Sequence, residues 1–180
     1  MRLAQPDRRS CGAAALVMAR RAMDAPYAAR VADEEAFASE VTAMHRRVTS
    51  LVDSAGGLQV PWLRMIGTPP WATARELSLL TGVEYGVHAA RRGGQVWEHV
   101  REATQQRPVA VYVGDRWTPR HVVLALGQSG DSTLTYEPSA GQITMVSRER
   151  WVHGPLRLAG WHRPWLAVAP ARGRRGQVQG

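Results

Sequence analysis

The chain contains a single cysteine, Cys11, and the residues around it favour a reactive thiol. Ser10 is a suitable N-cap residue and an apolar run follows, so Cys11 is expected in the first turn of a helix. The partial positive charge at a helix start stabilises a thiolate. Gly12, which has no side chain, leaves space for a substrate carbonyl beside the sulfur. These residues predict a nucleophile that attacks a carbonyl carbon, and the alternative is an inert thiol buried in the core.

A thiol nucleophile needs hydrogen-bond donors for the negative charge that develops on the attacked carbonyl oxygen. The backbone N–H of Cys11 can supply one donor. The side-chain amide of Gln5, six residues upstream and just before Pro6, can supply another. Gln5 is therefore expected to reach over the sulfur as an oxyanion donor, and the alternative is an ordinary surface glutamine.

The nucleophile also needs a base, and His121 is the best candidate among six histidines. His121 begins an apolar strand, "HVVLALG", and a polar ring at the mouth of a buried strand requires a partner. The remaining histidines fall on expected helices, at a strand end or in the C-terminal region, and need no role in catalysis: His45, His88, His99, His153 and His162. We therefore expect His121 to carry the proton.

The partner of His121 follows from an expected β-hairpin. The stretch "HVVLALGQSGDSTLTYE" contains two strands and a three-residue loop centred on Ser129, with Gly130 at the position that favours a positive φ. Residues equidistant from Ser129 then face each other, which places Glu137 opposite His121 with Cβ atoms roughly 4.5–5.5 Å apart. A carboxylate in this position fixes the imidazole tautomer and stabilises the imidazolium. A register slip of two residues is the alternative at this point.

Two other carboxylates are weaker candidates for orienting His121. Asp115 lies in the loop before the strand, and Asp131 falls at the turn of the hairpin. Trp117 lies in the same loop as Asp115, four residues before His121. Most of the seven tryptophans are expected in the core, but Trp117 is expected to wall the substrate cleft.

Helices are expected in the first part of the chain and strands in the second. The apolar spacing predicts helices over 11–23, 33–52 and 95–106. A further helix contains a capping box of Thr73 and Glu76 and ends at Gly82. The first helix is expected to be broken at Asp24, Pro26 and Tyr27. Strands are expected over 83–89, 109–113, 121–127, 133–137, 142–146 and 164–169, with a helical turn over 147–152. This order predicts an α+β domain over residues 1–170, with the helices packed on an antiparallel sheet, and a polar basic tail over 171–180.

The sequence resembles the papain-like cysteine peptidases of the C39 or C39-like family, which includes the peptidase domains of bacteriocin-exporting ABC transporters. The family motif is a Gln, five residues, then Cys-Gly at the head of a helix, matched by Gln5, Cys11 and Gly12. A His at the start of an apolar strand follows, and sixteen residues later an Asp-Pro pair. Here "RHVVLALG" supplies His121, and Glu137 with Pro138 replaces Asp-Pro. The resemblance covers roughly residues 3 to 170.

The resemblance implies a cysteine-dependent amide hydrolase or acyl transferase that acts on a protein or peptide substrate. A peptidase is the first expectation, and a glutamine deamidase or a transglutaminase would use the same chemistry. Free-standing domains of this kind also resemble bacterial toxin and effector domains, which would have a secretion or immunity partner. From another class, the chain could be an inactive binding module. No cofactor or metal is expected, since the sequence has no CxxC and no HExxH.

Composition sets limits on the remaining possibilities. Hydrophobic residues make up 44% of the chain, which is enough for a core, and one cysteine excludes an internal disulfide. The net charge of +8 comes from scattered arginines without any lysine, so it indicates codon bias more than a nucleic-acid surface. No apolar run reaches the roughly 18 residues of a membrane span, and no signal peptide is visible. The expectation is a soluble protein of the bacterial cytoplasm, or one secreted within a larger effector.

Overall fold

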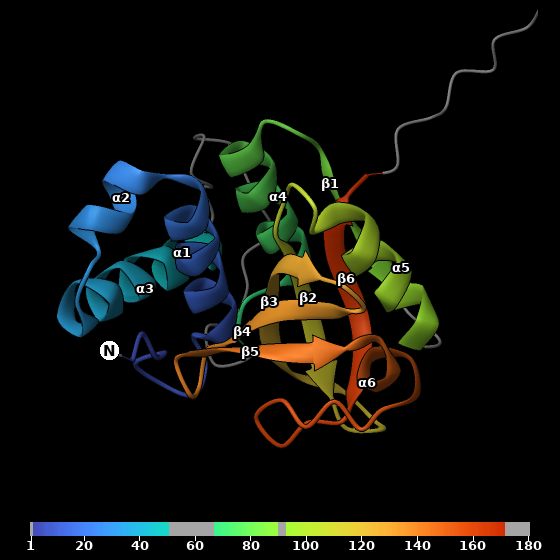
Figure 1. Ribbon diagram of the computed structural model, residues 1–180. Helices are drawn as coiled ribbons and strands as arrows, with labels where there is room; N and C mark the ends of the chain where they lie inside the picture. Colours follow the sequence, from blue (N-terminus) through green and yellow to red (C-terminus); the bar gives the residue numbers. More distant parts are fainter. Residues whose placement is uncertain (1, 51–66, 90–92, 172–180) are drawn as a thin grey trace, which may run out of the picture.

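The structure is a computed structural model, and it describes residues 2–50, 67–89 and 93–171 (Figure 1). Within these residues the helices are α1 (Cys11–Met23), α2 (Ala25–Arg30), α3 (Glu34–Val48), α4 (Pro70–Thr81), α5 (Gly93–Ala103) and α6 (Arg148–His153). The strands are β1 (Tyr85–Ala89), β2 (Val109–Gly114), β3 (Pro119–Ser129), β4 (Ser132–Glu137), β5 (Gln142–Ser147) and β6 (Arg163–Pro170). They form an antiparallel sheet in the order β1-β6-β2-β3-β4-β5, so the chain has the expected α+β fold.

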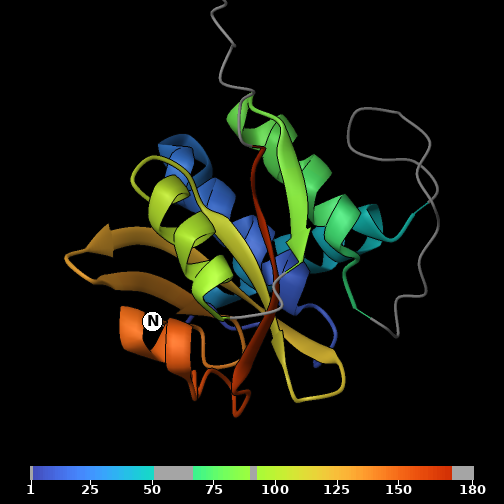
Figure 2. The same ribbon diagram turned by 90° about the vertical axis from the view of Figure 1, so that its right-hand side faces the viewer.

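Helices cover both faces of the sheet, as Figures 1 and 2 show. Helix α1 packs on β3 with α3 behind it, and α4 packs on β1, while α5 and α6 lie on the opposite face against β6 and β5. The two faces follow from the alternation of side chains along each strand. On β2, Ala110 and Tyr112 belong to the core beside α1, whereas Val111 and Val113 belong to the core beside α5. Both faces of the central strands are therefore apolar.

Helix α1 is the central element of the helical layer. Its residues from Cys11 to Ala19 are buried, because α1 lies between the sheet and α3. The run Ala13–Ala15 is fully buried, and such small side chains allow close approach to the strands. Helix α1 begins at Cys11 as expected, with Ser10 at the N-cap, but the Ser10 side chain makes no capping hydrogen bond. Its hydroxyl instead points to the carbonyl of Asp7 at 3.4 Å.

Several expected helix boundaries differ in the structure. The expected break after α1 is itself the start of the short helix α2: Asp24 caps it by accepting the N–H of Tyr27 at 2.9 Å, and Pro26 fits in its first turn. The expected capping box of Thr73 is wrong, because α4 begins three residues earlier at Pro70. Helix α3 ends at Val48 and helix α5 ends at Ala103, and both ends come earlier than expected. Residues 51–52 of the expected second helix and residues 172–180 of the expected tail lie outside the described residues.

The β3–β4 hairpin has a different register from the expected one. Ser129 pairs with Ser132, so the loop has two residues, and its first residue, Gly130, has a φ of 55°. A bulge between Ala125 and Gly127 then shifts the pairing, and Leu124 faces Tyr136. If this pairing is continued by one residue, Glu137 faces Val123 rather than His121. On the His121 side of the bulge the slip is two residues, which leaves His121 and Glu137 on their expected face.

No helix in the described ranges is both long enough and apolar enough to cross a lipid bilayer.

Candidate active site

Three of the residues singled out from the sequence meet where α1 packs on β3. Cys11 is the first residue of α1, and His121 lies near the start of β3. Both are almost completely buried, with 6% of Cys11 and 7% of His121 exposed. His121 Nε2 lies 2.7 Å from Glu137 Oε1. The Cys11 thiol also acts on this imidazole and raises its pKa, and Nδ1 is the ring nitrogen that Glu137 leaves unused.

Opposing effects act on the pKa of His121, and its partners decide the outcome. Burial alone would lower this pKa, because an imidazolium is costly to remove from water. Hydrogen bonds to Cys11 and then to Glu137, together with their negative charges, outweigh burial and raise the pKa to about 9. At pH 7 the imidazole is therefore protonated and pairs with the carboxylate of Glu137.

The carboxylate of Glu137 is held by the turn that follows β4. Its Oε1 accepts the N–H of Ser139 at 2.8 Å, and its Oε2 accepts the Ser139 hydroxyl and the N–H of Ala140, each at 2.8 Å. Burial would raise the pKa of Glu137, but the hydrogen bonds from His121, Ser139 and Ala140 lower it to about 2. Glu137 therefore stays ionised over the whole range in which a thiol enzyme works.

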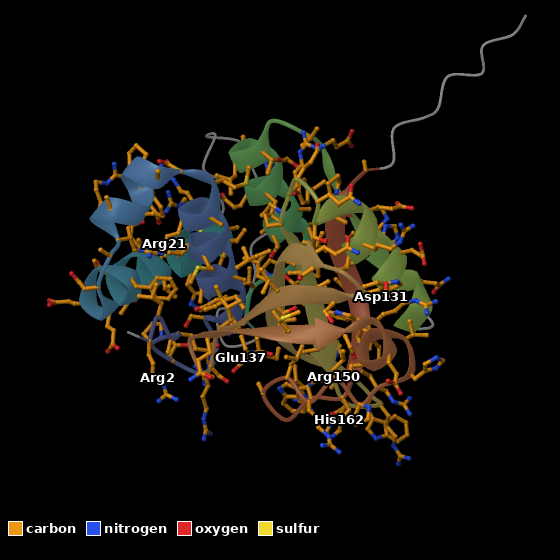
Figure 3. The ribbon with its side chains drawn as sticks, viewed as in Figure 1. Arg2, Arg21, Asp131, Glu137, Arg150 and His162 are labelled. Atoms are coloured by element: carbon orange, nitrogen blue, oxygen red, sulfur yellow. The ribbon has the colours of Figure 1, made fainter. Side chains whose placement is uncertain are left out.

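The same turn also holds the start of the chain. The N–H of Gln5 donates to the carbonyl of Pro138 at 2.8 Å, and the hydroxyl of Tyr136 donates to the carbonyl of Leu3. Gly141 has a φ of 63°, and a Cβ at this position would lie 2.7 Å from the nitrogen of Ala4, so only glycine fits. Figure 3 shows Glu137 at this end of the sheet, on the side where the chain begins at Arg2. The residues before Cys11 are thus attached to the turn that carries Glu137.

The side chain of Gln5 does not lie as expected. Its Nε2 donates to the carbonyl of Asp7 at 2.6 Å, and its Oε1 is buried without a hydrogen-bond partner. The structure therefore shows Gln5 near the site through its backbone, with one amide N–H already in use and the other still available. The N–H of Cys11 is the other candidate donor, and as the first residue of α1 it has no acceptor within the helix.

Gly12 has a packing role that the sequence did not indicate. A Cβ on Gly12 would lie 2.5 Å from the Cβ of Thr68, so the space expected for a substrate carbonyl is taken by this threonine. Thr68 is in turn fixed by the hydroxyl of Tyr112, which donates to its carbonyl at 2.9 Å and lies 2.8 Å from the hydroxyl of Thr73. These contacts attach the segment before α4 to both α1 and β2.

The rival carboxylates do not approach His121. Asp115 accepts the N–H groups of Trp117 and Thr118 at 2.6 and 2.9 Å and pairs with Arg120 at 3.6 Å. Asp131 lies at the opposite end of the hairpin from Glu137, as Figure 3 shows. Trp117 is 73% exposed in the loop between β2 and β3, with the guanidinium of Arg116 4.4 Å from its ring centroid.

Sequence reasoning missed Ser139, Thr68 and Tyr112. Ser139 had a local signal, since a serine two residues after a carboxylate in a Pro- and Gly-containing turn is well placed to donate to it. Thr68 and Tyr112 had none, because their contacts join segments far apart in the chain. In the parts of the chain that the structure describes, no three His, Cys, Asp or Glu side chains are grouped as metal ligands.

No protein-family model and no curated protein matches the sequence. Among solved structures, the peptidase domain of Streptococcus ComA, a bifunctional ABC transporter involved in a quorum-sensing pathway, is similar over 94% of this chain and 98% of that domain, with 15% identity and a TM-score of 0.47. The peptidase domain of Streptococcus mutans ComA is similar over the same shares, with 14% identity and a TM-score of 0.42. The chemistry of the site has to come from its own side chains.

Proposed function

We propose that the protein is a cysteine-dependent amide hydrolase that acts on peptides. The observation that carries the proposal is the buried chain of contacts from Cys11 through His121 to Glu137, with 2.7 Å between the imidazole and the carboxylate. A buried imidazole between a thiol and a carboxylate combines a nucleophile, a proton carrier and a group that orients the carrier.

The reaction follows from the positions of these groups. The Cys11 thiolate attacks the carbonyl carbon, and the carbonyl electron pair moves to the oxygen. The tetrahedral intermediate collapses, the C–N bond breaks, and the leaving amine takes the proton from His121. His121, now neutral, removes a proton from water, the hydroxide attacks the thioester, and the Cys11 thiolate leaves. Glu137 remains ionised throughout and keeps Nε2 of His121 protonated.

Two further residues complete the proposed site. The N–H of Cys11 and the side-chain amide of Gln5 would donate to the oxyanion, with the Gln5 amide turned from the carbonyl of Asp7 toward Cys11. Trp117 would contact the substrate, because the loop that exposes it leads directly into the strand that carries His121.

Wild-type protein and a Cys11→Ala variant should be incubated with a peptide library made from a bacterial proteome. We expect the wild type alone to create new peptide N-termini, measured by mass spectrometry. Iodoacetamide should also alkylate Cys11 of the folded protein at pH 6 to 7 faster than it alkylates a free thiol.

The same library separates the alternatives. Conversion of Gln to Glu without new termini would replace the peptidase with a deamidase, and attachment of an added amine to Gln would indicate a transglutaminase. Neither change in the library, together with alkylation of Cys11 only after unfolding, would show an inert buried thiol and a binding module.

Gln5→Ala is expected to lower turnover by about 10²–10³-fold, because one oxyanion donor contributes roughly 3–4 kcal/mol in the transition state. The thermal midpoint and the alkylation of Cys11 should change little, since neither depends on the amide. Gln105→Ala, at an exposed position, is the matched control. If Gln5→Ala keeps full activity on a substrate whose turnover requires Cys11, the Gln5 amide stays on the carbonyl of Asp7 during the reaction.

A further inference from the structure

Both oxygens of the Glu137 carboxylate have two donors each. Oε1 accepts from His121 and from the N–H of Ser139, and Oε2 accepts from the hydroxyl of Ser139 and the N–H of Ala140. A carboxylate held through one oxygen can rotate about its last bond, whereas one held through both cannot. The orientation of the Glu137 carboxylate is therefore fixed by Ser139 and Ala140, on the side away from His121.

Ser139 has a special place among these donors. The two backbone N–H groups remain whatever side chain is present, so the Ser139 hydroxyl is the one contact on Oε2 that a substitution can remove. We propose that Ser139 is a positioning residue of the site: its hydroxyl fixes Oε2 of Glu137 and thereby aligns Oε1 with Nε2 of His121. This inference rests on the function proposed for the same site, and it assigns to Ser139 no contact with substrate.

The turn does not need the Ser139 hydroxyl to keep its shape. The N–H of Gly141 donates to the carbonyl of Glu137 at 2.9 Å, and Gln5 donates to the carbonyl of Pro138. Gly141 is in addition packed against Ala4. Ser139 itself is exposed, so water could satisfy its hydroxyl, yet this hydroxyl is bonded to the carboxylate at 2.8 Å. Its loss should therefore change the carboxylate and leave the fold intact.

The test compares Ser139→Ala with Ser139→Thr, which keeps a hydroxyl, and with Ser129→Ala, a matched serine at the exposed end of the other hairpin. The pKa of Glu137 is followed through its carboxyl carbon by NMR, which needs no substrate. In Ser139→Ala this pKa should rise from about 2 toward its ordinary value of 4.5, because a hydrogen bond to the ionised form is lost. The kcat should fall about tenfold, the effect of one hydrogen bond to a charged group, with KM unchanged.

Ser139→Thr should restore both values, and Ser129→Ala should change neither. An unchanged pKa of Glu137 in Ser139→Ala would overturn the inference, as would a lowered thermal midpoint with an unchanged pH profile, which would mean that Ser139 only stabilises the turn. Failure of the proposed function has a different signature. In that case no substrate is cleaved by any variant, while the titration of Glu137 still reports on Ser139.

Discussion

Replacement of His121 with alanine is expected to lower turnover by about 10⁴-fold, because it removes both the proton donor for the leaving amine and the base for water. In the wild type, kcat/KM should fall on the alkaline side with a midpoint near pH 9, where the imidazolium loses its proton. The rate of turnover measured from pH 5 to pH 10 with one peptide substrate gives both results.

The control for this experiment is His153→Ala, which removes an exposed imidazole at the end of α6. Iodoacetamide provides a second measurement that does not need a substrate. Without His121 the thiolate loses its imidazolium partner, so alkylation of Cys11 at pH 6 should slow to the rate of an ordinary thiol. If kcat/KM of His121→Ala still falls with a midpoint near pH 9, the alkaline decrease belongs to another group.

Glu137→Gln is expected to destabilise the fold by about 3 kcal/mol, the usual cost of removing one partner from a buried pair. A glutamine amide can still accept from His121 through its oxygen. Its NH₂ group then occupies the place of Oε2, where it faces the Ser139 hydroxyl and the N–H of Ala140. The hydroxyl can turn to accept from this NH₂ group, but the N–H of Ala140 faces another donor and is left unsatisfied. Urea unfolding at pH 6, with the exposed Glu84→Gln as control, measures the loss.

The pH dependence of this loss follows from the two pKa values. The stability contributed by His121, whose pKa is raised from 6.5 to about 9, is complete below pH 6.5 and disappears as pH rises through 9. The stability contributed by Glu137, whose pKa is lowered from 4.5 to about 2, is complete above pH 4.5 and disappears as pH falls through 2. The difference between the wild type and Glu137→Gln should therefore be largest between pH 4.5 and 6.5. An equal difference at pH 10 would show that the charge pair contributes nothing.

Glu137→Asp keeps the negative charge of the side chain and shortens it, so this variant tests whether side-chain length matters as well as charge. Because Glu137 and His121 are diagonal rather than opposite neighbours, their Cβ atoms are expected roughly 7–8 Å apart. The shorter aspartate keeps the charge but loses the methylene that carries the carboxylate to both His121 and Ser139. Glu137→Asp should therefore lower kcat relative to the wild type, measured with the same peptide substrate at pH 7.

Local patterns were sufficient for most of the fold and for the main contact of the site. Helix α1 runs from Cys11 to Met23 as expected, with Ser10 at its N-cap and Asp24 at its C-cap, although the Ser10 side chain makes no capping hydrogen bond. The His121–Glu137 contact was found with a hairpin register that is wrong by two residues. An even slip keeps both side chains on one face, and the long glutamate side chain covers the remaining offset.

The parts that could not be predicted depend on distant segments meeting. A bulge between Ala125 and Gly127 shifts the hairpin register, and Gly127 within the strand is its one local sign. The contact of Gly12 with Thr68 requires α1 and the segment before α4 to be placed first. The Gln5 amide is an exception, because it donates to the carbonyl of Asp7, only two residues away.

The attachment of Leu3–Gln5 to the Glu137–Gly141 turn has a consequence for the nascent chain. Synthesis begins at the N-terminus, so Cys11 and the first helices exist long before His121, Glu137 or the turn on which the start of the chain docks. During that time Cys11 has none of the groups that we propose to act with it. These groups are brought together only when the β4–β5 turn closes over residues 3–5. The proposed site therefore forms only after synthesis has passed Gly141, however early its cysteine is made.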